Sequence, residues 1–123
     1  TISGIGKYLK EKNKNILVYA VEPSDSSLIS KGVYGSHSIQ GIGANFIPSI
    51  FDKNVVDEVI TISDEEITAV KSELVETEGL LVGISSLAAL AACKKVLTNE
   101  KNKNIVVIFP DGASKYFSTK FFK

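Results

Sequence analysis

Two segments of the chain share one pattern, and this pattern limits the possible folds more than any other feature. Glu11–Pro23, "EKNKNILVYAVEP", and Glu100–Gly112, "EKNKNIVVIFPDG", both leave a helical stretch through a polar turn and enter a continuous apolar run. Continuous apolar runs are typical of strands that are buried on both faces, as in parallel sheets. Helices that alternate with such strands predict an α/β domain with a mostly parallel sheet.

The spacing of apolar, capping and turn residues predicts the individual elements. In chain order they are helix 1–12, strand 16–21, strand 57–62, helix 63–78, strand 81–84, helix 86–97 and strand 105–109. Ser63 and Glu66 have the spacing of a capping box, and Gly79 is placed to end the same helix. The glycine-rich segment 24–48 is a long loop for one domain, and such loops are usually functional.

The composition of the 123-residue chain excludes several classes of function. The 14 basic residues, all lysine, balance the 14 acidic residues, which argues against a surface for nucleic acid or for an acidic membrane. Without arginine, a bound anion would be held by backbone N–H groups, hydroxyls or lysine. The single Cys93 and the single His37 argue against a structural zinc site, so no metal is expected.

The lone thiol of Cys93 suits a reducing compartment, and we expect a cytoplasmic protein. No apolar run is long enough for a membrane span. The chain contains no methionine and begins at Thr1, so we expect it to be a piece of a longer protein.

Ligands of parallel α/β sheets bind at the carboxyl ends of the strands. Four positions meet this condition: Glu22-Pro23, the loop around Gly41, Ser85-Ser86 and Pro110-Asp111. The two serines lie in "GLLVGISSLAAL", between an apolar strand-like run and an apolar helix. One hydroxyl is expected to cap the helix that begins near Leu87, and the other to face the ligand site.

Other motifs have a plainer interpretation. "GIGANF", Gly41–Phe46, has two glycines at dinucleotide-fingerprint spacing, but Phe46 occupies the third position and no strand leads into it. A glycine-rich turn, or a loop whose backbone approaches a ligand, fits better. His37 is expected at the surface and Cys93 in the core, while Glu65 and Glu66 are helix-start charges.

Thr1 is a hydroxyl residue at a helix start, with Gly4 and Gly6 close behind it. This arrangement is either an ordinary cap or the rear half of a phosphate cradle whose front half would lie upstream.

Six motifs occur in the order found in one enzyme family. They are "TISGIGKYLKEKN", "AVEPSDSSLI", "HSIQGIGANFIP", "DEEI", "EGLLVGISS" and "VVIFPDGASKYFST". From Thr1 to about Phe122 the chain resembles the carboxyl-terminal portion of cysteine synthase (O-acetylserine sulfhydrylase), a fold-type II enzyme that uses pyridoxal 5'-phosphate. The resemblance implies that residues 1–123 form one α/β domain of a larger subunit. That domain would have three layers, with a mostly parallel sheet flanked by helices, as in the large domain of the tryptophan synthase β-like fold.

The resemblance also implies roles for particular residues. Thr1 matches the last residue of the loop that holds the cofactor phosphate, and Ser85 matches the serine that meets the pyridine nitrogen. The loop that closes over the substrate matches Gly41, Ile42, Gly43 and Ala44. A serine hydroxyl is too weak an acid to protonate the ring, which favours loss of a β-leaving group over transamination. In this family the same loop borders the groove for the carboxyl-terminal peptide of serine acetyltransferase.

The implied activity is synthesis of L-cysteine from O-acetylserine and sulfide by β-elimination and replacement. The lysine that binds the cofactor covalently lies in the family's amino-terminal portion, outside this sequence. We therefore assign no catalytic residue here and expect this segment to be inactive alone. The family is typically a homodimer.

Two residues depart from the family pattern: Leu87 follows the serines where glycine is usual, and Asn45 replaces a common glycine of the closing loop. Leu87 could shift the helix start or fill space near the cofactor ring. Gln40–Ala44 matches the cysteine synthase loop better than that of cystathionine β-synthase, the nearest alternative. A non-catalytic homologue that binds the acetyltransferase tail is the alternative from another class.

Overall fold

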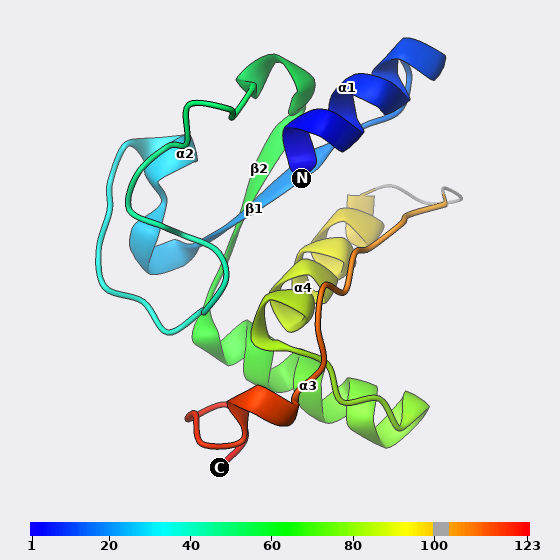
Figure 1. Cartoon of the computed structure of the whole chain (residues 1–123). Helices are drawn as coiled ribbons and strands as arrows, with labels where there is room; N and C mark the ends of the chain where they lie inside the picture. The colour runs from blue at the N-terminus through cyan, green and yellow to red at the C-terminus, as the bar shows by residue number, and fades with distance from the viewer. Residues whose placement is uncertain (100–103) are drawn as a thin grey trace.

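A computed structural model of the chain describes residues 1–99 and 104–123 (Figure 1). Helices alternate with two parallel strands, as the sequence predicts for an α/β domain. The elements are α1 Ile2–Lys12, β1 Tyr19–Pro23, η1 Ser24–Ser26, α2 Leu28–Lys31, η2 Lys53–Val55, β2 Glu58–Ile62, α3 Asp64–Glu78, α4 Ile84–Asn99 and η3 Ser114–Tyr116.

β1 and β2 form a parallel pair whose register runs from Tyr19 opposite Glu58 to Pro23 opposite Ile62. Two parallel neighbouring strands need a long connection between them. The long loop expected at residues 24–48 lies within the connection from β1 to β2, which contains only the short helices η1, α2 and η2. The apolar run predicts a strand from residue 16, but β1 begins three residues later, at Tyr19. The ladder of hydrogen bonds starts only there, opposite the first residue of β2, Glu58. Just before it, the backbone N–H of Asp57 donates to the carbonyl of Val18 at 2.9 Å.

Two expected strands do not form ladders in the described residues. In segment 81–84 only Val82 makes a bridge, antiparallel and isolated, to Gly112, and Ile84 already begins α4. Segment 105–109 has no assigned strand and leaves Val106 and Ile108 exposed. An apolar run favours a strand, but a ladder also needs a neighbouring backbone in register.

The local signals around α3 are confirmed. The Ser63 hydroxyl accepts from the Glu66 backbone N–H, and the Glu66 carboxylate accepts from the Ser63 backbone N–H, which completes the capping box. Gly79 ends the helix at φ +65°, a conformation that favours glycine.

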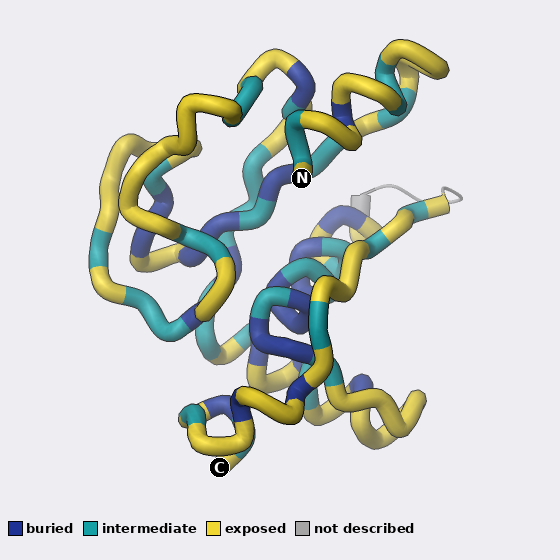
Figure 2. The backbone as a smooth tube through the Cα atoms, in the orientation of Figure 1, coloured by how far each residue is buried: buried dark blue, intermediate teal, exposed yellow. Residues whose placement is uncertain are grey.

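The hydrophobic core lies between α3, α4 and the end of β2 (Figure 2). Buried residues alternate with mostly exposed ones along α3 and with mostly partly buried ones along α4. Its helical members are Ile67, Val70, Leu74, Ile84, Leu87, Ala88, Ala91 and Ala92. Leu87, only 1% exposed, is a core residue. Since successive helical residues are about 100° apart, Leu87 lies on nearly the opposite face of α4 from Ser85.

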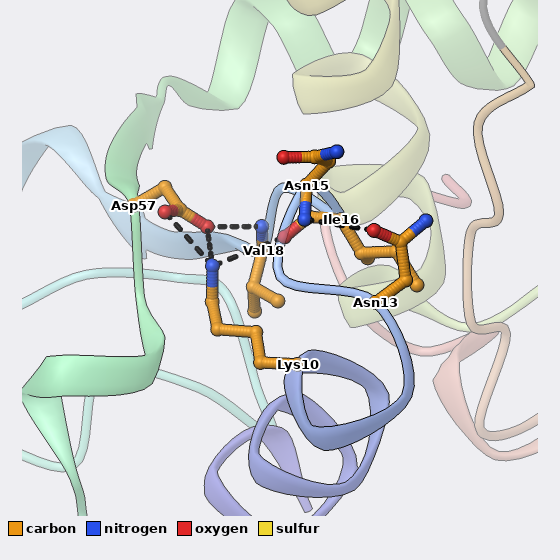
Figure 3. Close-up of polar contacts among 6 residues, drawn as sticks. All are labelled: Lys10, Asn13, Asn15, Ile16, Val18 and Asp57. Atoms are coloured by element: carbon orange, nitrogen blue, oxygen red, sulfur yellow. Dashed lines mark hydrogen bonds and ion pairs between the residues drawn. The ribbon is translucent and has the colours of Figure 1, made fainter.

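α1 is fastened to the sheet by Lys10 (Figure 3). The Lys10 ammonium donates to both carboxylate oxygens of Asp57, at 2.9 and 2.7 Å, and to the carbonyl of Ile16 at 3.0 Å. The backbone N–H of Val18 donates to the same carboxylate at 2.7 Å. The Lys10 hydrogen bond, followed by that from Val18, lowers the pKa of Asp57.

Candidate functional site

The loop around Gly41 lies against the first turn of α4. A Cβ placed on Gly41 would stand 3.4 Å from the hydroxyl oxygen of Ser85 and 3.5 Å from its Cβ. Gly41 has φ +98°, a value that side chains disfavour. The next residue, Ile42, packs against the core. Two motifs that the sequence suggested separately therefore meet in space.

His37 makes a hydrogen bond across this loop. Its Nε2 lies 2.7 Å from the carbonyl oxygen of Gly43, and since a carbonyl only accepts, Nε2 carries the donated proton. A Cβ on Gly43 would stand 2.6 Å from Nε2 and 2.8 Å from Cγ of Pro23, so only glycine fits between them. The expectation that His37 is simply a surface residue is wrong, because it is half-buried and shapes the loop at the carboxyl end of β1.

The two serines have different surroundings. Ser86 is fully buried, and its hydroxyl donates to the carbonyl of Asp111 at 3.4 Å. Ser85 is half-buried, and its hydroxyl has no hydrogen-bond partner among the residues that the structure describes. Ser85 is thus free to meet a ligand beside Gly41.

The expected serine cap is wrong because α4 begins at Ile84, ahead of both serines. The carbonyl of Gly83 accepts the first helical bond, from the backbone N–H of Leu87 at 3.0 Å. Leu87 therefore lies inside the helix, and the serines occupy its first turn.

Asp111 ties the start of α4 to the C-terminal segment. Its carbonyl accepts from the backbone N–H of Gly83 at 2.9 Å. Its carboxylate Oδ2 accepts from the Tyr116 hydroxyl at 2.6 Å and from the Lys115 ammonium at 2.9 Å. The bond from Tyr116, followed by that from Lys115, lowers the pKa of Asp111. The same bond raises the pKa of Tyr116, and the carboxylate raises the pKa of Lys115.

A Cβ on Gly83 would stand only 1.8 Å from Oδ1 of Asp111, which is buried without a partner in the described part of the chain. The sequence suggested Pro110-Asp111 only as a position at a strand end. It gave no signal for the contact between Asp111 and Tyr116.

Glu22, also suggested as a ligand position, makes its hydrogen bonds within the protein. Its buried carboxylate accepts from the backbone N–H groups of Ile29 and Ser30, at 2.8 and 3.0 Å, and from the Ser30 hydroxyl. Glu22 therefore anchors α2 and is not available to a ligand.

Thr1 stands at the N-terminal end of α1, exposed, and makes no capping hydrogen bond. A Cβ on Gly4 would meet nothing within 4 Å, so the first turn of the helix is open. Open N–H groups and a hydroxyl at the start of an 11-residue helix suit a phosphate group. The Ser85 hydroxyl suits a ring nitrogen, so the donors present fit a phosphorylated pyridine cofactor.

Within residues 1–99 and 104–123, no helix has both the length and the apolar character needed to cross a bilayer. The same residues contain no group of three or more His, Cys, Asp and Glu side chains that could hold a metal ion. Cys93 is half-buried, and burial raises the pKa of its thiol.

Comparison with protein families and known proteins gives a consistent result. The model of the family described as "Pyridoxal-phosphate dependent enzyme" matches residues 1–111. Cysteine synthase B of Campylobacter jejuni is 48% identical over 122 residues, which cover 99% of this chain and 40% of that protein. The chain thus spans about two-fifths of the length of this relative.

Two solved structures show the same fold. O-acetylserine sulfhydrylase isoform 3 from Entamoeba histolytica superposes with a TM-score of 0.92 at 40% identity, over 99% of this chain and 37% of that one. An O-acetylserine dependent cystathionine β-synthase from Helicobacter pylori superposes with a TM-score of 0.90 at 39% identity, over 100% of this chain and 40% of that one. The likeness to a cysteine synthase and the α/β fold class expected from the sequence are both confirmed.

Proposed function

The chain belongs to the family of pyridoxal-phosphate dependent enzymes, and we propose that the whole protein is a cysteine synthase that makes L-cysteine from O-acetylserine and sulfide. One observation carries the proposal: Gly41 lies beside the hydroxyl of Ser85, which has no hydrogen-bond partner among the described residues. A substrate loop and a cofactor contact are thereby adjacent. The 48% identity to a cysteine synthase B favours this activity.

Pyridoxal phosphate, when bound, draws electrons away from the α-carbon of an amino acid. Ser85 would hold the pyridine nitrogen by donating a hydrogen bond while keeping its own proton, since a hydroxyl is a very weak acid. Thr1 and the open N–H groups of α1 would hold the phosphate. Gly41–Ala44 would cover the substrate and exclude water.

The two departures from the family pattern are compatible with this role. Leu87 fills the core on the face of α4 away from Ser85, so it takes no space beside the Ser85 hydroxyl. Asn45 adopts φ +58°, a conformation that asparagine tolerates better than most residues.

Further properties belong to the same proposal. Residues 1–123 would be one domain of a larger, homodimeric, cytoplasmic subunit, and the covalently bonding lysine would lie in another part of it. The substrate loop could then also border a groove for the carboxyl-terminal peptide of serine acetyltransferase. This last property would be shared by a non-catalytic homologue.

The main alternative is a synthase that uses homocysteine in place of sulfide. The likeness to the O-acetylserine dependent cystathionine β-synthase, at 39% identity, favours it. Both activities would use the same Ser85 and the same loop, so the nucleophile distinguishes them.

The test uses the full-length protein with O-acetylserine and either sulfide or homocysteine, with the amino-acid products quantified. We expect a visible absorption band from bound cofactor that changes on adding O-acetylserine and returns on adding sulfide, with L-cysteine formed. A faster reaction with homocysteine would replace the first proposal with the alternative. Absence of bound cofactor would favour the non-catalytic homologue.

A further inference from the structure

Asn45 directly follows the substrate loop, Gly41–Ala44, and its backbone adopts an unusual conformation. Its φ of +58° is the only positive value at a non-glycine residue in the described part of the chain. The left-handed region is unfavourable for residues with a side chain, although asparagine enters it more readily than most. A backbone held there needs a contact that fixes it.

The contact is provided by Ser26, a residue of η1 that is only 1% exposed. Its hydroxyl donates to Oδ1 of Asn45 at 2.9 Å and accepts from the backbone N–H of Gly35 at 3.4 Å. The buried Ser26 hydroxyl therefore links both Gly35, which precedes the substrate loop, and Asn45, which follows it, to the residues that come directly after β1. Gly35 is held close as well, since a Cβ there would stand 2.6 Å from the carbonyl oxygen of Asp25.

Apolar contacts attach the middle of the loop, and Asn45 provides a polar attachment at its end. The bond between His37 and Gly43 lies within the loop, so it sets the shape of the loop without attaching it to the body. Ile39 is buried in the core and Ile42 packs against it, so both attach the middle of the loop. Beyond Asn45 the chain is exposed, with Phe46 at 64% and Ile50 at 80%. Asn45 thus provides the last polar contact between the loop and the body before this exposed segment.

We propose that Asn45 is a positioning residue whose hydrogen bond to Ser26 holds Gly41–Ala44 against Ser85 and sets how readily the substrate loop opens. The glycine common in related enzymes would permit the same backbone angle but would provide no acceptor for Ser26. This chain therefore has a tether that a glycine loop lacks. The effect on substrate binding rests on the proposed function, whereas the tether itself does not.

The first measurement is amide hydrogen exchange of the full-length protein without substrate. Asn45→Gly keeps the backbone conformation and removes the acceptor, Ser26→Ala removes the donor, and Asn45→Asp keeps both an acceptor and tolerance of the left-handed region. One lost hydrogen bond should speed exchange in peptides covering Gly35–Phe46 about two- to tenfold. Peptides from α3 should exchange as in the wild type.

The double variant Ser26→Ala/Asn45→Gly gives the sharper result. If the two side chains act through one bond, exchange in the double variant is no faster than in the faster single variant. Asn45→Asp should remain close to the wild type. Additive effects of the two substitutions, unchanged exchange in Asn45→Gly, or equally fast exchange in Asn45→Asp would each overturn the tether.

Steady-state kinetics then test the positioning role. In Asn45→Gly we expect the KM for O-acetylserine to rise about two- to tenfold with kcat nearly unchanged, and Asn45→Asp to restore the wild-type KM. A KM unaffected by Asn45→Gly in an active enzyme would overturn the positioning role. A protein inactive on every substrate, with the exchange pattern as expected, would refute the proposed function and leave the tether established.

Discussion

Gly41 lies beside Ser85: a single added carbon on Gly41 would stand 3.4 Å from the Ser85 hydroxyl oxygen. One residue lies in a long connection after β1, and the other lies in the first turn of α4. Their proximity brings the loop that we propose to close over the substrate to a hydroxyl that has no hydrogen-bond partner in the described part of the chain. It is also the relationship that the first prediction tests.

Gly41→Ala should impair substrate binding more than it impairs folding. The substitution forces a side chain into a left-handed conformation, at a cost of roughly 1–2 kcal/mol, and places a methyl group beside Ser85. Gly32→Ala is the matched control, because Gly32 has φ +70° and open space around it. We expect similar losses of thermal stability in both variants and a raised KM only in Gly41→Ala. Equal KM values would show that the contact with Ser85 has no role in binding.

Ser85→Ala and Ser86→Ala should separate ligand binding from stability. Ser85 has no hydrogen bond to lose within residues 1–99 and 104–123, so Ser85→Ala should change the free energy of unfolding by less than about 0.5 kcal/mol and weaken cofactor binding. Ser86→Ala removes a buried hydrogen bond to Asp111 and should cost about 1 kcal/mol. Cofactor titration and denaturant unfolding measure the two effects. Weaker cofactor binding in Ser86→Ala alone would reverse the assignment.

The pair of Lys10 and Asp57 should make stability sensitive to acid. Because the folded-state pKa of Asp57 is lowered from its ordinary value of 3.8, the pair stabilises the fold above that value. This contribution declines as pH falls through the lowered folded-state pKa. Asp57→Asn should therefore flatten the decline in stability at acidic pH, as followed by circular dichroism. The control Glu58→Gln removes an adjacent exposed carboxylate and should keep the wild-type slope.

Leu87→Ala should destabilise the domain by about 2–5 kcal/mol, because it removes a buried core side chain. Leu97→Ala is the control on the same helix, where the leucine is 47% exposed, and should cost far less. Leu87→Gly, which restores the residue usual in the family, should be less stable still, by about 1 kcal/mol of helix propensity. Higher cofactor affinity in Leu87→Gly would mean that Leu87 does intrude on the site.

Features whose cause lies within a few residues could be predicted from the sequence. The capping box of Ser63 and Glu66 joins residues three apart, and Gly79 ends α3 through its own backbone angle. The strands β1 and β2 were also predicted, to within a few residues, from their apolar residues, whereas their pairing with each other was seen only in the structure. Segment 105–109 has the same apolar character, yet no strand forms there, since composition does not supply a neighbour.

The sequence by itself determined the alternation of helices and apolar strands, the ends of α3 and the residues that carry the family likeness. Only the tertiary structure decided that Gly41 meets Ser85, that His37 bonds to Gly43, and that Ser86 bonds to Asp111 while Ser85 does not. Propensity and capping act between near neighbours along the chain. Contacts between loops and helices depend instead on where the whole core places them.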